Sequence, residues 1–212
     1  MNSQVNHKAL IVYYSFSNQT HRTVHVIEET LEDMGVACTK ERLRPSSPLS
    51  FPVNSIPRTF WLMLKTFFRW RVRIHPLSPQ ALNGGFDAII LAGPTWSYNP
   101  SGPVLTLIDE YGRRIFPQGT VIPVISCRSY WKAHYNYLKS RISGLGGAVT
   151  PPIVLRHPLR EPWKTLGVFF TIAGKNPKRL PIIRNKYTHY GHTKEQLEAV
   201  RGEIARLWRE YV

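Results

Sequence analysis

The sequence has few cysteines, few acidic residues and none of the glycine-rich signatures of the common nucleotide-binding loops. Its two cysteines, Cys38 and Cys127, are too few for a disulfide framework. Neither Gly-x-x-x-x-Gly-Lys-Ser/Thr nor Gly-x-Gly-x-x-Gly occurs, which argues against a nucleoside triphosphatase and a conventional Rossmann dehydrogenase. The histidines, including the close pair His189 and His192, lack a neighbouring cluster of cysteines or carboxylates, so we expect no metal site.

The sequence also lacks an apparent targeting or membrane-spanning segment. Its N-terminus has no positive patch followed by an apolar core, so we expect no secretory signal and a cytoplasmic protein. Residues 88–108 carry no charge, but their prolines, glycines and hydroxyl residues are not typical of a membrane span. A length of 212 residues favours one enlarged domain, 1–212, over two.

The first thirty-odd residues read as a strand, a hydroxyl-rich turn and a helix. Residues 9–14 form an apolar run without alternation, which is typical of a parallel strand covered on both faces. After the turn, four apolar residues follow at helical spacing: Val24, Ile27, Leu31 and Met34. A helix N-terminus with nearby hydroxyls can bind a phosphate monoester without a lysine, although the same residues also serve as ordinary helix caps. The turn therefore predicts either a phosphate site or a well-capped helix start.

Two further apolar strands, at residues 86–92 and 121–125, run into loops rich in polar and aromatic residues. Ligands of open parallel sheets bind outside the carboxyl ends of the strands, so we expect these loops to lie beside the first turn. Trp96 and Tyr98 can stack on a flat heterocycle or simply pack the loop onto the sheet. The spacing after the third loop predicts a helix whose buried stripe includes Trp131, Tyr135, Leu138 and Ile142. Thr193 is the expected N-cap of a final amphipathic helix.

The three loops, Tyr-Ser-Phe-Ser-Asn-Gln-Thr, Gly-Pro-Thr-Trp-Ser-Tyr-Asn-Pro and Ser-Cys-Arg-Ser-Tyr-Trp, resemble those of the flavodoxin-like FMN-binding proteins in order and spacing. The resemblance implies an α/β fold, a flavodoxin-like doubly wound five-stranded parallel sheet with helices on both faces. It also implies FMN as the cofactor, with three groups of contacting residues. Those around the phosphate are Ser15, Ser17, Asn18, Gln19 and Thr20; those against the isoalloxazine ring are Pro94, Thr95, Trp96, Ser97 and Tyr98; those along its remaining edge are Ser126, Cys127, Arg128 and Tyr130.

The charge differs from that of the acidic electron carriers that flavodoxins resemble. The formal net charge is +15, and acidic residues are absent from 42–86 and from 162–194. These stretches contain two basic-aromatic insertions, at about 44–82 and 157–191. Aromatic and basic residues are interleaved at 58–73 and 163–186. This pattern is typical of a helix bound to an anionic membrane surface, of plain packing with solvated cations, or of nucleic-acid binding. We favour the membrane surface and consider nucleic acid unlikely.

The second insertion, which precedes the last helix, is similar to the inserted loop of the menaquinone-dependent protoporphyrinogen oxidases. This resemblance implies a reaction near the inner face of the cell membrane. We therefore expect an FMN-dependent oxidoreductase that takes electrons from NAD(P)H or a redox partner protein and acts on a quinone-like or other lipophilic substrate. Two alternatives stay open: an electron-transfer protein without its own substrate, and a flavin-free adaptor that binds membrane or nucleic acid.

Overall fold

The computed structural model describes residues 7–181, 183–187 and 191–212. Its strands are β1 (Lys8–Tyr13), β2 (Ala37–Arg42), β3 (Ala88–Trp96), β4 (Asn99–Pro100), β5 (Thr120–Cys127), β6 (Ala148–Val149) and β7 (Ile153–Arg156). Its α-helices are α1 (Gln19–Asp33), α2 (Ile56–Phe67), α3 (Pro79–Leu82), α4 (Gly102–Ile115), α5 (Lys132–Ser143), α6 (Trp163–Ile172) and α7 (Lys194–Tyr211). Two short 3-10 helices, η1 (Phe116–Gln118) and η2 (Pro177–Arg179), complete the elements.

The sheet has the order β2-β1-β3-β5-β6, and these strands pair in parallel. β7 also pairs in parallel with β5, so β6 and β7 occupy one position in the sheet. Between them lie Pro151 and Pro152, which have no N–H to donate and so interrupt the ladder. The predicted five-stranded parallel arrangement is confirmed. The chain reverses its direction across the sheet between β1 and β3, which opens a crevice at the carboxyl ends of these two strands.

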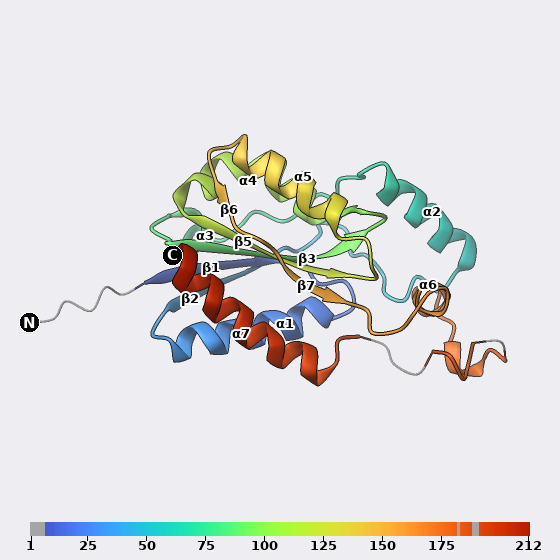
Figure 1. Ribbon diagram of the computed structural model, residues 1–212. Helices are drawn as coiled ribbons and strands as arrows, with labels where there is room; N and C mark the ends of the chain where they lie inside the picture. The colour runs from blue at the N-terminus through green and yellow to red at the C-terminus, as the bar shows by residue number, and fades with distance from the viewer. Residues whose placement is uncertain (1–6, 182, 188–190) are drawn as a thin grey trace, which may run out of the picture.

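Helices cover both faces of the sheet, with α1 and α7 on one side and α3, α4 and α5 on the other (Figure 1). The first core joins Val24, Ile27 and Leu31 of α1 to the buried stripe of α7 and the facing side chains of the strands. The second core joins α4 and α5 to the opposite face. Strand residues alternate between the two cores, so both faces are apolar, as the unbroken apolar run at residues 9–14 predicts.

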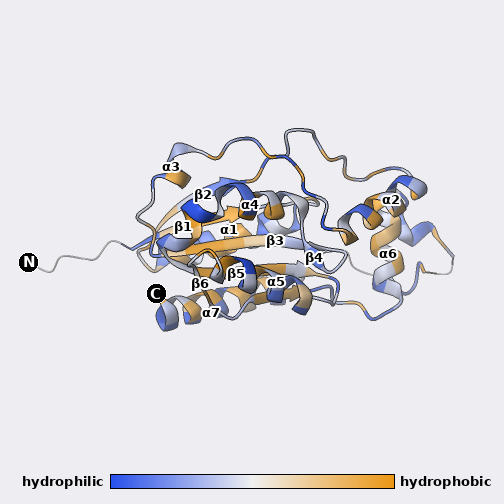
Figure 2. Ribbon diagram, turned by 90° about the horizontal axis from the view of Figure 1, so that it is seen from above, coloured by the Kyte–Doolittle hydropathy of each residue, from blue (hydrophilic) through white to orange (hydrophobic). Residues whose placement is uncertain are grey.

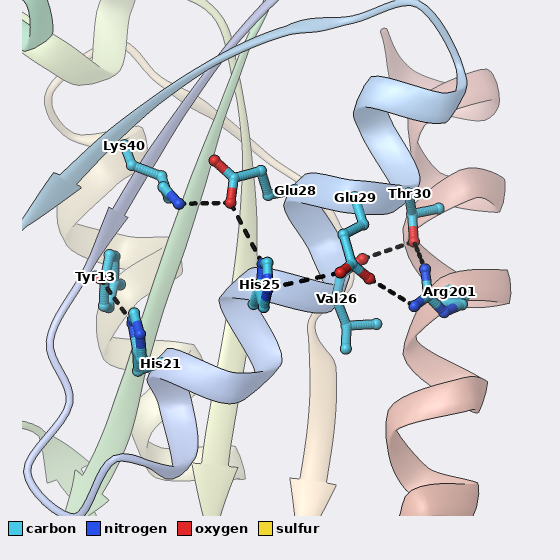
Figure 3. A network of polar contacts seen from close by, with 9 residues as sticks. All are labelled: Tyr13, His21, His25, Val26, Glu28, Glu29, Thr30, Lys40 and Arg201. Carbon is cyan, nitrogen blue, oxygen red and sulfur yellow. Dashed lines mark hydrogen bonds and ion pairs between the residues drawn. The ribbon is translucent and has the colours of Figure 1, made fainter.

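Polar contacts attach α1 to its neighbours along its exposed side (Figure 3). Arg201 of α7 donates to the Glu29 carboxylate at 2.7 Å and to the Thr30 hydroxyl at 3.3 Å. Lys40 of β2 donates to Glu28 at 2.5 Å. The predicted N-cap of α7 is confirmed, because the Thr193 side chain accepts from the Gln196 amide and completes a capping box. These contacts fix the C-terminal half of α1 against β2 and α7.

The predicted buried stripe of α5 is only partly correct. Leu138 and Ile142 are buried, but Trp131 lies before the helix and is half-buried, with the Arg156 guanidinium 5.8 Å from the centre of its ring. His134 takes the inward position instead. Helical spacing alone does not decide whether Trp131 or His134 is buried, since both lie at helical spacing from Leu138.

The parts of the two insertions that contain α2 and α6 lie together at the end of the molecule toward which the parallel strands point, whereas α3 lies beside β2 and α4 (Figure 1). The first contains α2 and the second contains α6, and the Val53 amide before α2 donates to the Ile172 carbonyl of α6 at 2.6 Å. The segment that follows α2 packs closely on α4. A Cβ added to Gly102 of α4 would lie only 2.7 Å from the Trp70 carbonyl oxygen. Within the residues described, no helix has the length and apolarity needed to cross a membrane.

Candidate functional site

The first turn of α1 faces a pocket at the carboxyl end of β1. Asn18 is the N-cap in a left-handed conformation, and its side chain caps no amide. The amides of Gln19 and Thr20 have no hydrogen-bond partner among the described residues, whereas the next amide, of His21, donates to the Ser15 hydroxyl at 3.2 Å. Two unpaired N–H groups at the positive end of a helix dipole are suited to an anion.

The carboxyl end of β3 supplies the second wall of the pocket, formed by Pro94, Thr95 and Trp96. Here the strand is longer than predicted, because Thr95 and Trp96 continue it and pair with β4. The Trp96 ring packs edge-on against Phe16, with ring centres 5.6 Å apart. Ser97 and Tyr98 form the turn of this hairpin with positive φ angles. The aromatic residue is thus held in a short hairpin and not in an open loop.

The carboxyl end of β5 supplies the third wall. The Ser126 hydroxyl is buried against this pocket and has no hydrogen-bond partner among the residues that the structure describes. Burial raises the pKa of the Cys127 thiol to about 11, against the opposing effect of Arg156 and Lys164, so this thiol is protonated near neutral pH and is a poor nucleophile. Arg128 forms no hydrogen bond or ion pair with any residue that the structure describes. This wall therefore presents an unsatisfied hydroxyl and a free guanidinium.

The structure brings nine of the predicted site residues together around the first pocket. They are Ser17, Gln19, Thr20, Pro94, Thr95, Trp96, Ser126, Cys127 and Arg128. The other five lie around it. Ser15 and Asn18 shape the turn, and the Ser97 hydroxyl donates to the Met63 carbonyl of α2. The rings of Tyr98 and Tyr130 contact each other on the surface, with centres 5.1 Å apart. The predicted three-loop arrangement thus corresponds to one continuous pocket.

The first pocket also contains residues that the sequence does not assign to this site: Phe51, His157, Val168, Ile172 and His192. All five come from the two insertions or the segment before α7. The His192 ring lies 3.2 Å from the Thr23 hydroxyl on the next turn of α1. His157 stacks on Tyr187 with ring centres 5.6 Å apart. No motif marks these residues, although the position of the insertions directly after the sheet's carboxyl ends places them near this edge.

A second pocket lies between α2 and α6 and shares a wall with the first. The residues common to both are Phe16, Thr95, Trp96, Arg128, Val168 and Ile172. The rest of the second pocket is lined by Thr59, Leu62, Met63, Thr66, Ser97 and Phe169. Its lining is mainly apolar and aromatic, with Arg128 as the charged residue. Such a lining is suited to an uncharged, lipophilic molecule.

His134 of α5 contacts the β3 wall of the first pocket, where its ring nitrogen lies 2.8 Å from the Thr95 hydroxyl. Burial lowers the pKa of His134 from 6.5 to about 3, so the imidazole stays neutral in the folded protein. No group of three or more metal-ligating side chains occurs within the described residues. His189, noted in the sequence as half of a close pair, lies outside them.

We expect His134 to make folding stability depend on pH. Below pH 6.5 the unfolded state binds a proton at this residue that the folded state does not bind, so stability falls as the pH falls. From pH 7 to pH 4.5, wild type should lose about 2 to 3 kcal/mol more unfolding free energy than His134→Gln. Urea denaturation of both proteins at the two pH values measures this difference. Equal losses would show that His134 becomes protonated without unfolding.

The sequence matches no protein-family profile and no curated protein. The fold, however, is that of several solved flavoproteins. A Lactobacillus acidophilus flavoprotein in complex with FMN aligns at a TM-score of 0.53 and 19% identity, covering 70% of this chain and 93% of that one. A flavoprotein from Bacteroides eggerthii aligns at a TM-score of 0.55 and 17% identity, over 80% and 99%. An archaeal flavodoxin aligns at a TM-score of 0.51 and 15% identity, over 96% and 97%. The chain has a flavodoxin-like fold.

Proposed function

We propose that this flavodoxin-like protein is an FMN-dependent oxidoreductase that transfers electrons to a quinone-like, lipophilic acceptor close to a membrane surface. The observation that carries the proposal is the pair of adjoining pockets at the carboxyl edge of the sheet. One offers unpaired amides and hydroxyls, and the other is apolar. When bound, FMN supplies the redox chemistry, and the protein sets its orientation and access.

The residues of the first pocket fit FMN. The free amides of Gln19 and Thr20, with the hydroxyls of Ser17 and Thr20 on the same wall, provide donors for a phosphate monoester. At the opposite wall, the unpartnered Ser126 hydroxyl can bond to a polar edge of a ring. Buried polar groups without partners are uncommon in proteins, so this hydroxyl supports a bound polar ligand. The ring contacts predicted for Trp96, Ser97, Tyr98 and Tyr130 remain part of the proposal.

The second pocket is our candidate for the acceptor site. It borders the same Trp96 and Arg128 that border the first pocket, so molecules in the two pockets would be neighbours. NAD(P)H would deliver a hydride, and a quinone would leave as a quinol after gaining two electrons and two protons, one of them from water. The free Arg128 guanidinium can stabilise negative charge that develops on an acceptor oxygen, and so favours two-electron chemistry.

The test is turnover by the purified protein with bound FMN. We expect a flavin absorption spectrum and NAD(P)H oxidation that depends on an added short-chain quinone. If the flavin is reduced only by a partner reductase and no quinone is consumed, the protein is an electron carrier without its own substrate. If the protein is colourless and FMN does not raise its melting temperature, it is a flavin-free adaptor. Either result rejects the proposed function.

A further inference from the structure

Helix α2 turns two threonines and two partly buried apolar residues, Leu62 and Met63, toward the second pocket, and its aromatic residues toward solvent. Thr59 is completely buried and Thr66 nearly so, whereas Phe60 is 65% exposed and Phe68, at the C-cap, is 73% exposed. We call the exposed apolar residues the outer face of α2: Ile56, Phe60, Trp61, Leu64, Phe67 and Phe68. An amphipathic helix of a globular protein normally packs its apolar stripe on the core. Here the aromatic residues of the helix lie on the exposed side.

Hydrogen bonds explain how α2 stays attached by its inward side. The Thr66 hydroxyl lies 2.8 Å from the Ser97 hydroxyl in the β3–β4 turn. The Asn99 side chain donates to the carbonyls of Thr66 and Phe67, at 3.2 and 3.0 Å, and so satisfies the C-terminus of the helix. The Thr59 hydroxyl donates to the Ser55 carbonyl. The inward threonines are therefore satisfied, and the orientation of the helix is fixed by specific contacts.

Basic residues surround the outer face, and the sequence has no acidic residue from 42 to 86 or from 162 to 194. Arg58 is exposed, and the Lys65 ammonium lies over the rings of Trp61 and Trp70, at 5.6 and 5.0 Å. The second insertion brings one cation, Lys175, near the start of α2. Its neighbour Gly174 packs closely on Asn54, because an added Cβ would lie 2.1 Å from the Asn54 side-chain oxygen. Figure 2 shows hydrophobic residues on both α2 and α6 at this end of the molecule.

We propose that the outer face of α2 docks on an anionic phospholipid bilayer. A stripe of large apolar side chains parallel to the surface can enter the acyl boundary, while flanking cations contact the headgroups. A second copy of this chain is a poorer partner, since a symmetric contact would bring two basic rims together. The inner face of the same helix lines the second pocket, so docking would place that pocket next to the bilayer. The role of the second pocket as an acceptor site beside the bilayer rests on the proposed function.

Vesicle flotation tests the docking surface without any turnover. The probes are vesicles of pure phosphatidylcholine and vesicles with a third of phosphatidylglycerol. We expect wild type to float only with the anionic vesicles. Phe60→Gln/Phe68→Gln should bind them about tenfold or more weakly. Because both side chains are exposed, the double variant should keep the wild-type melting temperature. Tyr211→Gln, which changes an exposed aromatic residue on α7, is the matched control and should bind like wild type.

The cations are tested in the same way. Arg58→Glu should weaken binding to anionic vesicles about tenfold, whereas Arg113→Glu, the same change on the exposed side of α4, should have little effect. Equal flotation of the Phe60/Phe68 variant and wild type would overturn the proposal. So would a dimer, detected by light scattering without vesicles, that this variant dissociates. Flotation does not require flavin or quinone, so a protein that binds vesicles but lacks turnover would refute only the proposed function.

Discussion

Replacement of Thr20 by glutamate is expected to lower the affinity for FMN at least about a thousandfold. The Thr20 side chain is buried against the first pocket, in the first turn of α1. A carboxylate about 5 Å from a phosphate dianion, at an effective dielectric constant near 20, costs on the order of 6 kcal/mol, part of which water and ions screen. Fluorescence titration of the apoprotein with FMN measures the loss.

Two comparisons make this result specific to the phosphate. Riboflavin has no phosphate, so its affinity should fall much less than that of FMN in Thr20→Glu. Thr39→Glu, the same change on β2 outside the first pocket, should leave FMN binding as in wild type. Since Thr20 is buried, Ser17→Glu provides a second variant at a half-buried position of the same pocket. Unchanged FMN affinity in folded Ser17→Glu and Thr20→Glu would refute this location for the phosphate.

Filling the second pocket is expected to reduce quinone turnover while FMN binding is retained. Met63 lines this pocket but not the first, so Met63→Trp should occupy the proposed acceptor site. We expect kcat/KM for a short-chain quinone to fall about a hundredfold, which corresponds to roughly 3 kcal/mol of lost transition-state binding. The affinity for FMN and the rate of flavin reduction by NAD(P)H should change little.

The adjacent residue provides the control. Leu64 is exposed on the outer face of α2, so Leu64→Trp adds the same side chain on the opposite side of the helix. It should retain wild-type quinone turnover in solution. If Met63→Trp and Leu64→Trp turn over the quinone equally well, the acceptor binds elsewhere.

Much of the fold could be predicted because its strands are unambiguous. Residues 9–14 are apolar throughout, and such a run is explained best by a strand buried on both faces. The order of the three loops then predicted their common edge. What could not be predicted is which side of α2 faces the rest of the protein. Apolar residues occur on both sides of α2, and helical spacing does not say whether Met63 or Leu64 points to the pocket or to solvent. The polar contacts of Thr66 and Asn99 decide it, and these depend on a hairpin far along the chain.

The candidate site shows the same division. Ser17, Thr20, Pro94, Trp96 and Ser126 could be identified because each lies in a segment that follows a predicted apolar strand. His157 and His192 could not, since their approach to the pocket depends on how the second insertion folds back. The predicted buried stripe of α5 includes Trp131 and omits His134, because a neutral buried imidazole requires a partner, here Thr95, that the sequence does not reveal.

The most direct test of the account is a titration of the apoprotein with FMN and with riboflavin. The central claim is that amides and hydroxyls at the start of α1 hold the phosphate next to a ring site at the ends of β3 and β5. We predict one FMN per chain and an affinity for riboflavin at least about tenfold lower, because charged hydrogen bonds to the phosphate would be missing. Equal affinities for the two flavins, or no binding of either, would contradict the account.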